Sequence, residues 1–212
     1  MIRILSLFLL LCASIVANAQ IKKGAVLLGG QLTYNRYSSL NAAVPNNNDV
    51  SKSGSFSISA GKAVKENAAF GLIASYAPSR SNFPYTTGTG SSIADKKVKQ
   101  YSAGVFYRRY KQLFKDLYIF GEGTLSYTGM HQSELFASNG FKSIYTEHGG
   151  QLYFTPGISY NLFKKLQAEL LIPSLLSISY TRSNNDQQRF TASTGLQNTN
   201  LGYLGVGFHV IL

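Results

Sequence analysis

The sequence predicts an all-β fold, an eight-stranded antiparallel up-and-down transmembrane β-barrel with short periplasmic turns and four long extracellular loops. Three observations predict it. Apolar and polar residues alternate in eight segments, the connections between these segments alternate in length, and the chain opens with the layout of a secretory signal. After residue 20 no apolar run is long enough for a transmembrane helix, so a membrane-spanning form of this chain must cross with strands.

The first 19 residues have the three parts of a secretory signal peptide. Arg3 supplies a positive start, residues 4–16 are apolar, and small side chains lead up to Ala19. We expect cleavage after Ala19, with residues 20–212 forming one barrel domain. Two alternatives are an N-terminal membrane helix, for which the apolar run is short, and a lipoprotein signal at Cys12, which follows a bulky residue where a small one is required.

Composition limits the classes of partner. Cys12 is the only cysteine and leaves with the signal, so we expect no disulfide in the mature chain. Loss of Arg3 reduces the 20 basic residues to 19 against 9 acidic ones, a net charge of 19 − 9 = +10. The basic residues are scattered and no nucleic-acid-binding motif is present, so we expect no nucleic-acid partner. Contact with anionic lipid headgroups accounts better for the basic excess.

Each predicted strand shows alternation with a period of two residues, which places apolar side chains on one face and small or polar ones on the other. The eight segments are 24–37, 54–64, 68–77, 98–110, 117–128, 150–162, 166–181 and a terminal segment that begins near residue 200. Pro156 and Pro173 lie inside two of these segments, and we expect a bulge or a break in register at each.

The connections divide into two kinds. Three are short, and the other four are long, polar and rich in Asn, Ser, Gly and Thr. The short connections are 65–67, 111–116 and 163–165, and the long ones are 38–53, 78–97, 129–149 and 182–199. Short turns on one rim and long loops on the other are typical of outer-membrane barrels. Both termini would then lie on the periplasmic rim.

The terminal segment alternates to the last residue. Large apolar side chains occupy the even positions 204–212, while Gly205, Gly207 and His209 occupy odd ones. We expect the even face to meet lipid and the odd face to meet the barrel lumen. Pairing of this segment with residues 24–37 would close the barrel and remove both sheet edges.

The alternative all-β fold is a secreted soluble barrel or sandwich with its apolar face inward. The polar face of the predicted strands consists mainly of Gly, Ser, Thr and Gln, which suit a confined lumen better than a water-facing surface. Tyrosines gather toward strand ends, as in an interfacial girdle: Tyr34, Tyr37, Tyr76, Tyr127 and Tyr180. Arg109, Lys111 and Lys115 resemble interfacial anchors at the periplasmic rim. We therefore favour the membrane barrel.

Four ionisable residues are predicted to point into the lumen: Arg108, Glu122, Glu169 and His209. Two carboxylates beside Arg and His could form an acid/base site. We favour a buried ion-pair network, because charges in a lumen are costly unless they are paired. Such a lumen is filled by side chains rather than open.

Other site signals are weak. His131 and His148 lie near Glu134 and Glu147 in one long connection, but without the spacing of metal ligands. Nothing resembles a nucleophile elbow or a Ser-His-Asp arrangement. We expect no catalytic residue, no metal and no cofactor.

Several short motifs resemble the small outer-membrane β-barrel proteins of Bacteroidetes. They are 105–110 (VFYRRY), 117–123 (LYIFGEG), 155–160 (TPGISY) and 204–208 (LGVGF). The resemblance implies an eight-stranded barrel of OmpA/OmpX-like shape in the outer membrane of a Gram-negative bacterium, usually without an assigned activity. The chain departs from the family at Leu212, where an aromatic final residue is usual.

Three functional hypotheses follow. The first is a structural or surface-interaction barrel whose loops bind an extracellular partner. The second is a narrow channel or conduit for small or hydrophobic solutes. The third is an enzyme acting on lipid, which requires a catalytic pair at the outer rim, and no such pair is evident. We favour the first, with outer-membrane lipid and the barrel-assembly machinery as further partners.

Overall fold

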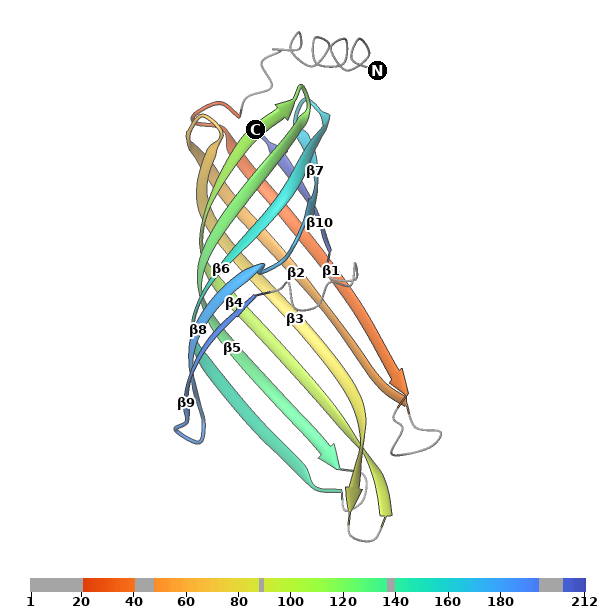
Figure 1. Ribbon diagram of the computed structural model, residues 1–212. Helices are drawn as coiled ribbons and strands as arrows, with labels where there is room; N and C mark the ends of the chain where they lie inside the picture. Colours follow the sequence, from red (N-terminus) through yellow and green to blue (C-terminus); the bar gives the residue numbers. More distant parts are fainter. Residues whose placement is uncertain (1–20, 41–47, 88–89, 137–139, 195–203) are drawn as a thin grey trace, which may run out of the picture.

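The computed structural model describes residues 21–40, 48–87, 90–136, 140–194 and 204–212, which form ten antiparallel strands (Figure 1). Their bounds are β1 (Val26–Leu40), β2 (Asn48–Lys65), β3 (Ala68–Thr87), β4 (Gly90–Phe114), β5 (Leu117–Phe136), β6 (Lys142–Phe163), β7 (Leu166–Leu171), β8 (Leu176–Ser183), β9 (Gln188–Thr194) and β10 (Gly205–Ile211). The described part of the chain contains no helix that is long and apolar enough to cross a membrane. The predicted signal peptide, residues 1–19, lies outside the described residues.

Eight of the strands form a closed ring. The strand order is β5-β4-β3-β2-β1-β10-β7-β6, and β5 also pairs with β6. The first and last strands pair from Leu27 opposite Ile211 to Leu32 opposite Val206. Next to the Leu27–Ile211 pair, the backbone amides of Val26 and Leu212 each donate to the carbonyl of the other, at 2.9 and 2.8 Å. The predicted all-β, eight-stranded antiparallel barrel and its closure by the terminal segment are therefore confirmed.

The predicted seventh strand is divided at Pro173. β7 ends at Leu171 and pairs with β6 and β10, whereas β8 starts at Leu176 and pairs with β6 and β9. Pro156 lies on β6 at the point where the partner strand of β6 changes from β8 to β7. The missing N–H of Pro156 therefore interrupts neither of these two ladders. Pro156 causes no break in β6, and its carbonyl accepts the amide of Ile172 at 3.0 Å.

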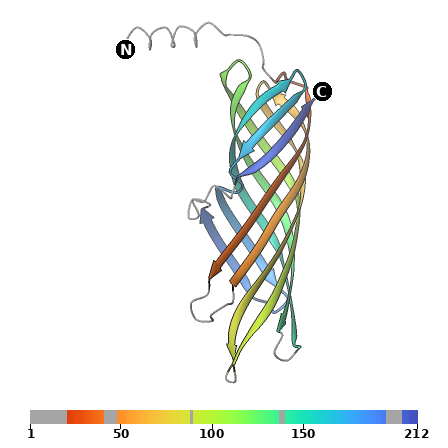
Figure 2. The same cartoon turned by 90° about the vertical axis from the view of Figure 1, so that its right-hand side faces the viewer.

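The strands are longer than predicted at the end opposite the short turns. β3 and β4 pair as far as Thr87 opposite Gly90, and β5 and β6 as far as Leu135 opposite Lys142. These two hairpins project beyond the rest of the barrel (Figures 1 and 2). Much of the predicted loops 78–97 and 129–149 is therefore paired strand, and β9 lies within the predicted connection 182–199. The prediction failed there because polar residues such as Ser79, Arg80 and Lys97 interrupt the apolar alternation that marks a strand.

The outer wall of the barrel is apolar, and the buried charged side chains lie inside. Leu32 and Leu72 are 61% and 65% exposed on the outer wall, whereas Arg108 is 1% exposed in the interior. The terminal strand follows this rule as predicted, with Phe208 exposed and His209 buried. A soluble barrel has the opposite arrangement, because water favours polar groups outside.

An apolar cluster fills the interior at the end with the short turns. Ile21 packs there with Tyr110, Tyr118 and Phe120, all of them buried. Asn67 fastens the segment before β1, because its side-chain oxygen accepts the amide of Ile21 at 3.1 Å and its own amide donates to the Ile21 carbonyl at 3.0 Å. These bonds hold Ile21 at the end of the barrel with the short turns.

Candidate functional site

The four predicted lumen residues lie together next to the apolar cluster, where Arg108 contacts Tyr110 and Phe120. Arg108 on β4 is directly opposite Glu122 on β5, Glu169 lies on β7, and His209 lies on β10. Each is 3% exposed or less. The structure therefore brings together all four residues, although they come from strands far apart in the sequence.

Arg108 is the centre of the network. Its Nε donates to Glu122 Oε2 at 2.8 Å, and its Nη1 donates to Glu169 Oε1 at 2.6 Å. Nη1 also lies 3.1 Å from the Tyr110 hydroxyl oxygen, to which it donates. One guanidinium thus joins two carboxylates through charge-assisted hydrogen bonds, which are stronger than neutral ones.

His209 extends the network to the first strands. Its Nδ1 lies 3.1 Å from Glu169 Oε1, and its Nε2 lies 3.3 Å from Ser59 Oγ. We assign the Nδ1 proton to the bond with Glu169, because a carboxylate is the stronger acceptor. The ring also requires the glycine at position 29, because a Cβ there would overlap the imidazole.

Two members of the site were not predicted, Tyr110 and Phe120. The Phe120 ring centroid lies 4.4 Å from Arg108 Cζ, a cation–π contact on the face of the guanidinium. Both residues have the same parity as the charged residues of their strands, so the alternation of 106–110 and 118–122 contained the signal. They screen the network from the end of the barrel with the short turns.

The arrangement favours an ion-pair network over acid/base chemistry. Glu122 and Glu169 are both held by Arg108, and Glu122 Oε1 also accepts the Thr124 hydroxyl at 3.3 Å. A general base needs access to a substrate proton, and these carboxylates are buried. We therefore infer that the network stabilises the lumen.

The residues weighed as a metal site are separated by the barrel wall. His131 and His148 are exposed on the outer face, whereas Glu134 and Glu147 lie on the alternate, inward positions of the same strands. Glu147 accepts hydrogen bonds within the lumen from the side chains of Tyr145 and Thr181. Among the described residues, no group of three or more His, Cys, Asp or Glu side chains is arranged to hold a metal ion.

Replacing Glu122 by Gln is expected to lower the free energy of unfolding by about 1–3 kcal/mol, because Arg108 loses one charged acceptor in the dry interior. Denaturant unfolding in phospholipid vesicles measures the change. Glu66→Gln, in the exposed turn after β2, is the control and should change stability by less than about 0.5 kcal/mol. Equal stabilities of the two variants would contradict a stabilising network.

Comparison of the sequence with protein-family models and with curated proteins gives no match. Solved structures with similar folds include Neisserial surface protein A, at 16% identity and a TM-score of 0.45, covering 89% of this chain and 97% of that one. A major outer membrane protein from Thermus thermophilus gives 10% identity and a TM-score of 0.46, covering 89% and 98%. Ail, the attachment invasion locus protein of Yersinia pestis, gives 12% and 0.38, covering 89% and 95%.

Proposed function

We propose that this chain is an integral outer-membrane β-barrel protein with a structural or surface-interaction role and no catalytic activity. The reversal of polarity across the barrel wall carries the proposal. Large apolar side chains cover the outside of all eight ring strands, and the charged residues Arg108, Glu122 and Glu169 are inside. Transfer of each large apolar side chain from water to an apolar environment is favourable by about 1.5–3 kcal/mol. Lipid is therefore a better solvent for this wall than water.

The two ends of the barrel support an orientation. The short turns and the described ends of the chain lie at one rim, as in outer-membrane barrels whose turns face the periplasm. The signal peptide predicted over residues 1–19 is consistent with this route. The β3–β4 and β5–β6 hairpins would then project from the cell, and we propose them as the surface that meets an extracellular partner. Their polar arms suit such a role.

The filling of the lumen supports a closed barrel over a conduit. The apolar cluster around Ile21 and the network around Arg108 occupy successive levels of the interior. Toward the other end, a polar cavity of about 150 Å³ is lined by inward side chains that include Gln100, Glu147 and Thr181. A cavity of this size holds a few water molecules and is not an open pore.

The motifs that resemble small Bacteroidetes outer-membrane barrels support placing the chain in that group, with the barrel-assembly machinery as its partner during insertion. We propose this placement on the motifs 105–110 and 155–160. The structure puts both on ring strands, β4 and β6.

Two measurements test the proposed function. Protein folded into phospholipid vesicles should migrate faster on gels when unheated than when boiled, and planar bilayers containing it should show no steady single-channel conductance. A boiled sample that migrates like the unheated one would contradict the membrane barrel. Discrete conductance steps would contradict the closed lumen and favour the conduit.

A further inference from the structure

Four cationic side chains form a row across the outer wall on β1–β4. Strand register places Arg36 opposite Lys52, Lys52 opposite Arg80, and Arg80 opposite Lys97. All four are exposed. Each is an even number of residues from an outward-facing aromatic side chain on its own strand, so all four share the outer face. We call these residues the cationic row.

Repulsion within the cationic row lowers the stability of the barrel when no anion is bound. Like charges directly opposite on neighbouring strands are destabilising, and the row contains three such pairs. Asp95 compensates one charge: its two carboxylate oxygens accept Arg80 Nε and Nη2 at 2.9 Å each, and it lies 3.4 Å from Lys97 Nζ. The hydrogen bond from Arg80 lowers the pKa of Asp95, which keeps this carboxylate ionised at neutral pH.

The remaining positive charge has no partner in the described chain. Arg36 and Lys52 take part in none of the ion pairs among the described residues. Four cations and one carboxylate leave a net charge of 4 − 1 = +3 on this strip. The fold leaves this repulsion between cationic side chains uncompensated. An anionic ligand would relieve it.

The depth of the cationic row matches the headgroup region of a membrane. An aromatic row, Phe56 opposite Tyr76 opposite Tyr101, crosses three of these strands, β2–β4, and is exposed on the same face. Each of its members is four residues from the cationic side chain on its strand, about 13 Å along the strand at about 3.3 Å per residue. Aromatic girdles mark the edge of the apolar layer, so the cationic row lies just beyond that edge.

A groove of about 400 Å³ separates the two rows. Three members of the cationic row line it together with Lys99. Its floor includes Gly54, which has no side chain, and Pro78, whose side chain is a small ring. The groove therefore presents four cationic side chains around a shallow floor that a headgroup can approach.

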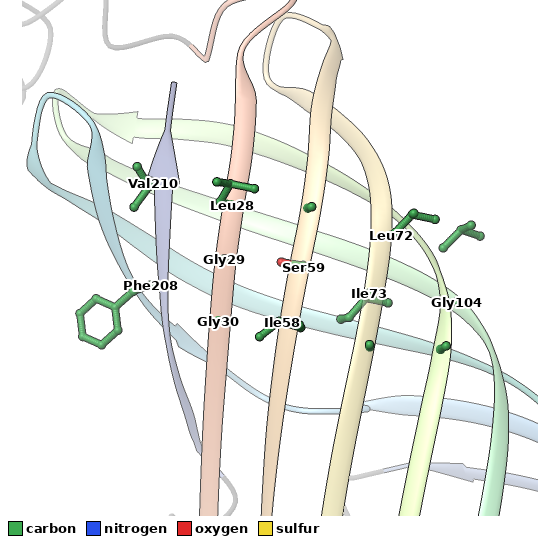
Figure 3. A pocket seen from close by; sticks show the side chains of 14 residues that line it. Leu28, Gly29, Gly30, Ile58, Ser59, Leu72, Ile73, Gly104, Phe208 and Val210 are labelled. Carbon is green, nitrogen blue, oxygen red and sulfur yellow. The ribbon is translucent and has the colours of Figure 1, made fainter.

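An apolar groove of about 960 Å³ runs over these four strands and β10, nearer the middle of the wall. Figure 3 shows Leu28, Leu72 and Phe208 pointing away from the ribbon around it. Small outward residues form its floor: Gly30, Ala60, Ala74 and Ala103. This shape fits acyl chains, which lie along an apolar surface without needing hydrogen bonds.

We propose that the outer wall of β1–β4 binds a membrane lipid with a phosphate-bearing headgroup. The phosphate lies between Lys52, Arg80 and Lys97, and the acyl chains occupy the apolar groove. Phosphate fits the site because its oxygens accept several charge-assisted hydrogen bonds and match the fork of an arginine. The inference rests on the proposed function, since it requires this wall to face lipid.

The test uses folded protein in non-ionic detergent, checked by its fast-migrating unheated band. Diphosphorylated lipid A and its fully dephosphorylated form are the two probes. We expect the phosphorylated form to bind more tightly, and Lys52→Gln combined with Arg80→Gln to weaken it about 30-fold, at roughly 1 kcal/mol for each basic residue. Raising the salt concentration should weaken binding to the unchanged protein.

The control pair is Lys62→Gln combined with Arg109→Gln. It also removes one lysine and one arginine from exposed outward positions of the β1–β4 wall, at the opposite rim. We expect it to change the affinity by less than about twofold. An equal loss of affinity in both double variants would contradict the proposed site. Equally tight binding of the dephosphorylated lipid would also contradict it. Inorganic phosphate that binds as tightly as the lipid would identify a soluble anion as the ligand instead. Loss of the folded band in the unchanged protein would count against the membrane barrel itself.

Discussion

Deleting Val206–Leu212 is expected to abolish folding into membranes. The deletion removes the partner of both β1 and β7, so two sheet edges become unpaired at once. Each unpaired backbone group costs several kcal/mol in hydrocarbon, where no water can satisfy it. The truncated chain should show no heat-dependent gel shift after incubation with phospholipid vesicles and should be digested fully by added protease.

Deletion of Gln188–Thr194 is the matched control, because it removes the same number of residues, seven. β9 pairs only with β8 among the described strands and is outside the closed ring. We expect this variant to keep the gel shift. A heat-modifiable protein after loss of Val206–Leu212 would show that the terminal strand does not close the barrel.

Arg108→Ala is expected to lower the free energy of unfolding by about 3–5 kcal/mol, because it leaves Glu122 and Glu169 buried without their shared cation. The neighbouring Arg109→Ala removes the same side chain from the exposed outer face and should change stability by less than about 0.5 kcal/mol. Denaturant titration in phospholipid vesicles, followed by gel mobility, compares the two directly.

A triple variant separates pairing from packing. Arg108→Met combined with Glu122→Gln and Glu169→Gln removes the guanidinium and both carboxylates while keeping similar volumes. It should recover part of the stability that Arg108→Ala loses, since no uncompensated carboxylate remains. If Arg108→Ala proves as mild as Arg109→Ala, the network does not stabilise the lumen.

The sequence predicted strands where the two faces of the wall meet different solvents. In the terminal segment, Phe208 and His209 could be assigned to opposite faces because lipid and lumen select different side chains. The hairpin arm around Arg80 gave no such contrast, since Ser79 and Ser81 are polar like their neighbour. Period-two patterning gives no signal where side chains on both faces are polar, although the backbone ladder continues.

The sequence predicted which charged residues point into the lumen, but not which of them contact one another. Parity alone shows that Arg108, Glu169 and His209 point inward. Their meeting depends on how the strands are staggered around the ring, which brings together residues 61 positions apart in the pair of Arg108 and Glu169. No local pattern encodes that stagger. The cationic row was missed for a similar reason, because Arg36, Lys52 and Arg80 look scattered until the register aligns them.

The central claim is that the outer wall meets lipid, and thiol labelling along β3 tests it directly. In a Cys12→Ser background, Leu72→Cys and Arg80→Cys each provide one thiol on the outer face, one in the apolar band and one in the cationic row. In phospholipid vesicles, a membrane-impermeant maleimide should label position 80 and leave position 72 unlabelled until the protein is unfolded in urea. Labelling of position 72 in intact vesicles at the rate of position 80 would contradict a membrane-spanning barrel.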